Sequence, residues 1–325
     1  MKIKNKRGFE MSFAWMFAIA VGAIIIFLAI YLAVKIVGTK DVESATVVAH
    51  EFGNILDPLD VGSASAKSAK ILLNEDIRIY NRCYENEPFG RQDFSVSEYR
   101  RNEWREEGIP VRVQNKYVFS KAVPESDEFY FFSKSFEFPF KVSDVIFMTT
   151  GKYCFVSPPS EIAAEIVGLK FENIKTIEDR DDCLPDATTV CFDSSGCDIS
   201  VVPMCSGYGC DSRFDYGMVQ RGSETMYYVQ RSLMYGAIFS DQDIYECNVK
   251  RLMMRVKQIA FLYSDEANYL IKEGCGNVMS TNLLSFATNA NIQSSAGVVG
   301  LRAQALQLDE QNKASKTQCY IWGNL

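Results

Sequence analysis

Histidine is almost absent from this chain: His50 is the only one among 325 residues. A Ser-His-Asp or Cys-His catalytic site needs a histidine as its base, so any such site here must use His50. That residue lies on a predicted helix close to a hydrophobic segment, where a solvent-facing side chain is the simpler interpretation. Histidine-based catalysis is thereby nearly excluded, whereas carboxylate pairs remain possible.

Other familiar signals are also missing. The sequence contains no GxxxxGK[ST], GxGxxG, HExxH or GxSxG pattern, which removes the commonest nucleotide-binding, zinc-protease and hydrolase interpretations. It has no Asn-x-Ser/Thr glycosylation sequon. The net charge of −7 argues against nucleic-acid binding, which requires a basic face. We therefore assign no catalytic, cofactor-binding or metal-binding residue and predict no cofactor.

The N-terminal segment lacks charge over a long stretch. Residues 11–34 carry no charged side chain and are long enough to span a hydrocarbon core of about 30 Å. Basic residues precede this stretch, namely Lys2, Lys4, Lys6 and Arg7. The positive-inside rule then predicts a cytosolic tail (1–10), an uncleaved transmembrane anchor (11–37) and an exported remainder. A cleaved signal peptide is the alternative, but its hydrophobic region is usually shorter.

An amphipathic helix is predicted directly after the anchor, over residues 38–58. Its apolar positions recur at spacings of three and four residues. They are Val42, Ala45, Ala49, Phe52 and Leu56. We interpret this segment as a stalk whose apolar stripe packs against a second copy, another membrane or cell-surface protein, or the chain's own exported part.

Small residues form a ladder on one face of the anchor, at Ala14, Ala18 and Gly22. Such a face lets two helices approach closely in lipid, which favours a homo-oligomer. The ordinary Ala and Gly content of a spanning helix is the alternative interpretation.

Cysteine is plentiful, and every cysteine follows the anchor. The ten are Cys83, Cys154, Cys183, Cys191, Cys197, Cys205, Cys210, Cys247, Cys275 and Cys319. An even number confined to the exported side predicts disulfides. Zinc binding is the rival hypothesis, but the spacings lack CxxC pairs. The pairing stays open at this point.

The exported part alternates short apolar segments with turns, and then becomes helical. Strands are expected from about 70 to 157 and helices near 160–167, 241–274 and 296–312. We predict an α+β fold with a long N-terminal transmembrane-plus-stalk helix, an antiparallel β-rich head (59–175) and a Cys-rich loop region with C-terminal helices (176–325).

Two segments are candidates for ligand binding. Acidic residues at 178–182 and Asp186 offer oxygen ligands for calcium, although the EF-hand pattern is absent and a solvated loop is the simpler interpretation. The aromatic run at 129–140 fits either a binding platform for sugars or peptides or a β-sheet core.

The N-terminal order of features resembles that of type IV pilin-like proteins. Lys6, Arg7, Gly8 and Phe9 look like the leader-peptidase junction of that family, with cleavage expected after Gly8. The family usually carries Glu at the fifth mature position, whereas here that position is Phe13 and Glu10 is the second. The chain also resembles single-span exported proteins of archaeal genomes. No catalytic residue carries over from either group.

Taken together, the sequence predicts a single-pass membrane protein with a cytosolic N-terminus and an extracytoplasmic C-terminal part. Its leading predicted function is structural or binding, at the cell surface or in a membrane-anchored assembly, with the lipid bilayer and another protein as partners. A pilin-like filament subunit processed after Gly8 is the first alternative. A membrane-tethered hydrolase that uses carboxylates is the second.

Overall fold

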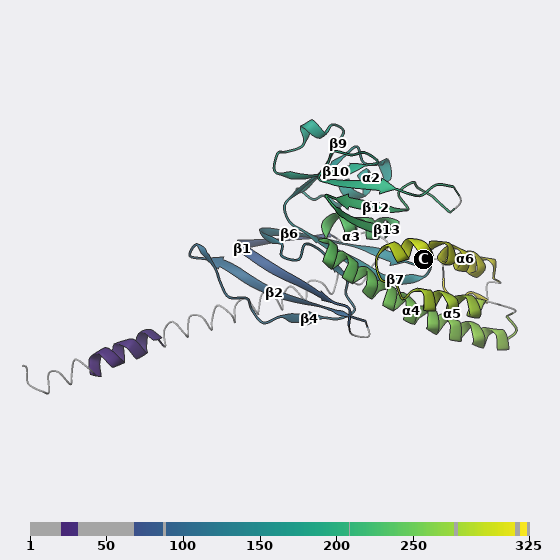
Figure 1. Cartoon of the computed structure of the whole chain (residues 1–325), viewed down its shortest axis with the longest axis horizontal. Helices are drawn as coiled ribbons and strands as arrows, with labels where there is room; N and C mark the ends of the chain where they lie inside the picture. The colour runs from purple at the N-terminus through teal and green to yellow at the C-terminus, as the bar shows by residue number, and fades with distance from the viewer. Residues whose placement is uncertain are drawn as a thin grey trace, which may run out of the picture.

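The structure is a computed structural model, and it describes residues 21–31, 68–86, 89–207, 209–275, 279–315 and 319–323. Residues 21–31 are helical and lie apart from the rest (Figure 1). The other described residues form two β-sheets with helices between and beside them (Figure 1).

The first sheet has seven strands in the order β3-β2-β1-β6-β7-β5, with β4 also paired to β2. Their bounds are β1 (Ser68–Tyr84), β2 (Arg91–Arg100), β3 (Glu103–Trp104), β4 (Val111–Val113), β5 (Val118–Phe119), β6 (Glu125–Glu137) and β7 (Lys141–Thr149). Most neighbours are antiparallel, but β5 runs parallel to β7. The sequence alternates apolar side chains along these strands, so that both faces of the sheet bury aromatic and aliphatic residues.

This first sheet curls on itself. The Gln92 side chain on β2 donates to the Val118 carbonyl at 2.9 Å and accepts from the Val118 amide at 2.8 Å, so it takes the place of a neighbouring strand for β5. Asn81 on β1 donates to the same carbonyl. Strands near the two edges are thereby joined, and the curl surrounds an apolar cluster that includes Phe94, Phe129 and Phe131.

The second sheet has six strands in the order β13-β12-β11-β10-β8-β9. Their bounds are β8 (Lys152–Val156), β9 (Ile174–Ile177), β10 (Ala187–Phe192), β11 (Ile199–Pro203), β12 (Tyr216–Arg221) and β13 (Glu224–Val229). The four strands β9, β8, β10 and β11 are parallel, whereas β12 and β13 are antiparallel to their neighbours. This sheet contains strands from both sides of residue 175, the predicted boundary between the β-rich head and the Cys-rich region.

The described helices of the head are α2 (Ser160–Leu169), α3 (Gln230–Phe239), α4 (Gln242–Lys272), α5 (Met279–Asn289) and α6 (Ala296–Ala314), and a single 3-10 turn, η1, spans Arg180–Asp182. Helix α3 lies between the two sheets and contacts β6 and β7 on one side and β12 and β13 on the other (Figure 1). Its residues 232–239 are all buried. A Cβ added at Gly236 would lie 2.8 Å from the Phe119 ring, so a glycine is needed for this close approach.

All ten cysteines are bridged, which confirms the prediction of disulfides. The pairs are Cys83–Cys247, Cys154–Cys183, Cys191–Cys197, Cys205–Cys210 and Cys275–Cys319. Four of the bridges join a cysteine to the next cysteine along the sequence. The fifth, Cys83–Cys247, links β1 to α4 across 164 residues.

The predicted fold class is wrong in two respects. Both sheets are mixed rather than antiparallel. In the first sheet β5 pairs parallel to β7. In the second sheet β8 pairs parallel to β10, which is possible because the chain between these two strands is long and includes α2 and β9. In addition, within the ranges given above no helix is both long enough and apolar enough to cross a membrane, so the described fold has to be stated without the predicted transmembrane-plus-stalk helix.

Several predictions lie outside the described residues. They concern the tail (1–10), most of the anchor (11–37), the stalk (38–58), His50, the Gly8 and Phe9 junction, and Ala14 and Ala18. Of the proposed helix-packing face only Gly22 is described, and an added Cβ there would meet nothing within 4 Å.

Candidate functional site

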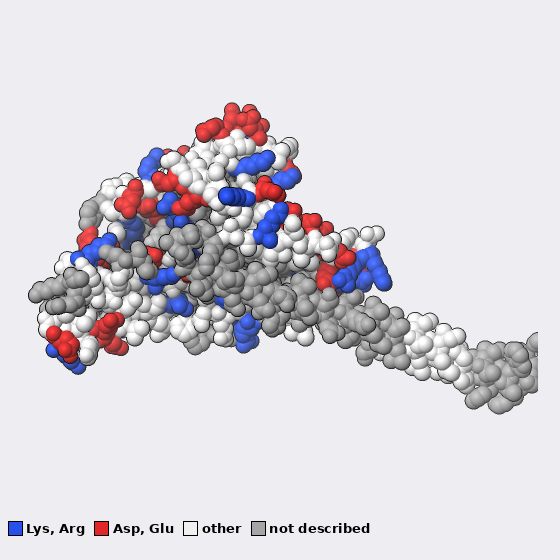
Figure 2. Space-filling view, turned by 180° about the vertical axis from the view of Figure 1, so that it is seen from behind, with Lys and Arg blue, Asp and Glu red and all other residues white. Residues whose placement is uncertain are grey.

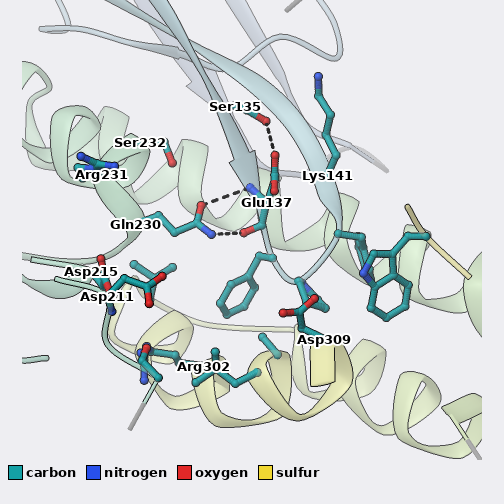
Figure 3. Close-up of a pocket in the computed structure, with 18 of the residues that line it drawn as sticks. Ser135, Glu137, Lys141, Asp211, Asp215, Gln230, Arg231, Ser232, Arg302 and Asp309 are labelled. Carbon is teal, nitrogen blue, oxygen red and sulfur yellow. Dashed lines mark hydrogen bonds between the residues drawn. The ribbon is translucent and has the colours of Figure 1, made fainter. Parts of the chain in front are cut away.

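An open groove with a volume of about 630 Å³ lies where β6, β7 and the start of α3 meet α6 (Figure 3). The turn between β6 and β7 supplies Phe138, Pro139 and Phe140. Helix α6 presents one face to the groove, because its lining residues recur at helical spacings. These are Arg302, Ala305, Leu306, Asp309 and Lys313. The segment before β12 closes one end with Gly209, Asp211 and Asp215.

Gln230 holds two walls of the groove together. Its side-chain amide donates to the Glu137 carbonyl at 2.6 Å and accepts from the Glu137 amide at 3.3 Å, while its backbone amide donates to the Asp215 carbonyl at 2.6 Å. Figure 3 shows Gln230 between Glu137 on one side and Asp211 and Asp215 on the other. Its backbone is left-handed, with φ of 61°, which is unfavourable for a residue other than glycine. Such strain is common at binding sites, where the surrounding contacts maintain it.

The Cys205–Cys210 bridge shapes the end wall. It closes a short loop, and Arg302 of α6 donates to the Gly209 carbonyl within that loop. The Arg302 guanidinium also lies 4.5 Å from the centre of the Tyr216 ring, a cation–π contact. The loop is therefore fixed both covalently and by α6.

The charges in the groove do not balance. Three of its five cations pair with carboxylates that do not line it: Lys134 and Arg231 with Glu165, and Lys141 with Asp144. The remaining cations are Lys313, which pairs with Asp309 at 2.7 Å, and Arg302. Four carboxylates line the groove, at Glu137, Asp211, Asp215 and Asp309. Because Lys134 and Arg231 share Glu165, the five cations face these four carboxylates together with Glu165 and Asp144, and the excess is one negative charge.

The floor is apolar but includes two polar atoms without partners. The Phe140 and Trp322 rings meet edge to face with their centres 5.5 Å apart. The Trp322 indole nitrogen and the Ser232 hydroxyl are buried without a hydrogen-bond partner, and both residues line the groove. Trp322 is 7% exposed and Ser232 is fully buried. A buried polar atom without a partner costs about 1–3 kcal/mol, and both atoms are enclosed by the protein, so this cost falls on the stability of the fold.

The chemistry of these groups suits non-covalent recognition. The lining includes carboxylates, lysines, arginines, an amide and aromatic rings, and the two cysteines of the end loop are bonded to each other. Carboxylates bind ammonium or guanidinium groups, and aromatic faces bind apolar or cationic groups.

The acidic segment predicted as a calcium candidate lies far from this groove, in the loop around η1. Figure 2 shows acidic side chains gathered at that tip of the molecule. Within the loop, Asp179 accepts a hydrogen bond from the Asp181 amide, and Asp186 pairs with Lys152 at 2.7 Å. Among the residues that the structure describes, no group of three or more potential ligands is placed to hold a metal ion.

The aromatic run at 129–140 divides between core and groove. Phe129 and Phe131 point into the curled first sheet, and Phe132 and Phe136 point into the main core. Only Phe138 and Phe140, in the turn, line the groove as well. The core interpretation of this run is therefore confirmed, and the binding-platform interpretation stays a prediction for the turn.

A second polar cluster is buried beside the Cys83–Cys247 bridge. Arg251 is completely buried, and its guanidinium donates to Gln92 at 3.1 Å and to Asn248 at 2.8 Å. Burial lowers the pKa of Arg251 to about 10. These contacts connect α4 to the side chain that joins β2 and β5, so the cluster supports the curl of the first sheet.

Comparison with protein-family models, with curated proteins and with solved structures finds no match to this chain.

Sequence reasoning did not find the groove. Glu137, Gln230 and Arg302 come from three distant parts of the chain, and each lies in an ordinary local pattern. The only local signal was the Phe-Pro-Phe turn at 138–140 within the aromatic run. The left-handed backbone of Gln230 could not be predicted from its residue type, because glycine or asparagine usually occupies that conformation.

Proposed function

We propose that this protein is an extracytoplasmic binding protein, attached to the cell membrane, whose groove between β6, β7 and α6 binds a partner. The groove carries the proposal, since it combines apolar lining residues with an excess of negative charge. The five disulfides favour an oxidising, extracytoplasmic compartment. Membrane attachment rests on the uncharged sequence of residues 11–34, with the N-terminus cytosolic.

Photo-crosslinking in living cells tests whether the groove binds a partner. Lys313→p-benzoylphenylalanine places the photoreactive group at the rim of the groove. Lys272→p-benzoylphenylalanine is the matched control, because Lys272 is also an exposed lysine at the end of a helix but lies at the end of α4, away from the groove. We expect an adduct of one defined mass at position 313 and none at position 272.

Two results would contradict the proposal. One is an absence of adducts at position 313 in protein that is exported and fully oxidised. The other is the same set of adducts at both positions, which would indicate random contacts of an exposed surface.

A further inference from the structure

We propose that the ligand of the groove is an extended polypeptide segment that carries lysine or arginine side chains. This inference rests on the binding function proposed above and specifies the chemistry of the partner. It starts from the charge excess, because a ligand with positive charges removes the repulsion among the carboxylates that line the groove.

The carboxylates come from two walls of the groove. Glu137 ends β6, and Asp215 lies in the segment before β12, and both residues are hydrogen-bonded to Gln230 through their backbones. Asp211 lies beside Asp215, because its backbone amide donates to the Asp215 carboxylate at 2.6 Å. Figure 3 shows Glu137 on one side of Gln230 and Asp211 and Asp215 on the other. An extended ligand with two cations would therefore meet carboxylates of both walls.

The Glu137 carboxylate is available to such a cation. Its contact with a side chain is a hydrogen bond from the Ser135 hydroxyl at 3.2 Å, and among the described residues it has no ion pair. Asp309, by contrast, is already paired with Lys313. The two acids differ in this respect although both line the groove.

The floor fits the remaining parts of a basic peptide. The methylene stem of lysine or arginine packs on apolar surface while its charged end stays polar, and the half-buried Pro139 and Leu306 provide that surface. One ligand class thereby fits both the charge excess and the apolar part of the groove.

The test uses the full chain in detergent micelles and three labelled peptides. The peptides share one nine-residue sequence with blocked ends and differ only at two positions, which are both lysine, both glutamine or both glutamate. Fluorescence anisotropy at low salt measures the dissociation constants. We expect the lysine peptide to bind about ten times more tightly than the glutamine peptide and the glutamate peptide to bind least.

Two double variants localise the effect. Glu137→Gln with Asp211→Asn removes two groove carboxylates and should weaken the lysine peptide about tenfold while leaving the glutamine peptide unchanged. Asp265→Asn with Glu266→Gln makes the same change of charge on the exposed surface of α4 and should leave both peptides unchanged.

Equal affinity for the three peptides would overturn the inference, as would an equal loss in both double variants. Binding of a glucosamine oligomer in place of the lysine peptide would also overturn it, by indicating a carbohydrate ligand. Any of these three outcomes together with an adduct at position 313 would leave the binding function in place and remove only the basic peptide. Absence of the adduct would remove the binding function itself.

Discussion

Tyr228 and Tyr245 are both buried, but only one of them uses its hydroxyl group. The Tyr245 hydroxyl donates to the Tyr227 carbonyl at 2.6 Å, whereas the Tyr228 hydroxyl has no hydrogen-bond partner. Burial raises the pKa of both phenols. The pair therefore separates the effect of burying a hydroxyl from the effect of its hydrogen bond.

We predict opposite effects for the two phenylalanine variants at pH 7. Tyr245→Phe should lower the free energy of unfolding by about 1 kcal/mol, because a buried hydrogen bond is lost. Tyr228→Phe should leave it unchanged or raise it, because only an unpaired hydroxyl is removed. Urea denaturation measures both. An equal loss in the two variants would show that the Tyr228 hydroxyl has a partner.

The same variants should reduce the loss of stability at alkaline pH. Unfolded tyrosine ionises near pH 10, whereas the buried phenols stay protonated to higher pH because their pKa is raised. The unfolded state then binds fewer protons, so the free energy of unfolding falls as the pH rises through 10. Removing either phenol should make this fall less steep, and denaturation at a series of pH values between 8 and 11 measures the change.

Some of the important residues could be predicted from the sequence, and others could not. Most of the ten cysteines were predicted to be bridged, because their even number and their location after the anchor are properties of the sequence. Gln230 and Arg251 were not found, since their importance depends on partners more than a hundred residues away or on a backbone conformation that their residue type rarely adopts.

At the scale of elements, the first sheet was largely predictable and the second was not. Alternation of apolar residues located β1, β2, β6 and β7 of the first sheet and, in the second sheet, β8. The window from 183 to 210 was interpreted as a loop region, yet it contains β10 and β11. Alternate residues of these strands are buried, namely Val190 and Phe192 in β10 and Ile199 and Val201 in β11. The high Cys and Gly content of the window hid this strand pattern. Parallel pairing and the position of α3 between the sheets depend on long-range contacts that no local pattern records.

The disulfides differ in how strongly they should stabilise these elements. In the chain-entropy model a bridge across 164 residues contributes about 5 kcal/mol, and one across 5 residues contributes about 2 kcal/mol. We therefore expect Cys83→Ala with Cys247→Ala to lower the free energy of unfolding more than twice as much as Cys205→Ala with Cys210→Ala. Denaturation of the two oxidised double variants measures the difference, and equal losses would contradict the model.

At the scale of the whole molecule, the proposal of export makes a direct prediction of topology. Epitope tags at the two ends of the chain should respond differently to protease added to intact cells. The N-terminal tag directly precedes four basic residues and should be protected, whereas the C-terminal tag should be digested. A cytosolic marker controls for lysis. Digestion of the N-terminal tag with survival of the C-terminal one would contradict the proposed localisation.

The pairing of the cysteines has a consequence for the order of events during biosynthesis. If each cysteine formed a bridge with the next one synthesised, Cys83 would pair with Cys154 and each later pair would be shifted by one cysteine. Of the native bridges, only Cys275–Cys319 would then form. If Cys83 stays reduced, every following bridge up to Cys205–Cys210 joins consecutive cysteines, and Cys247 then arrives as its partner. If the bridges form in the order of synthesis and without later exchange, the Cys83 thiol must therefore stay reduced until Cys247, 164 residues further on, has been synthesised.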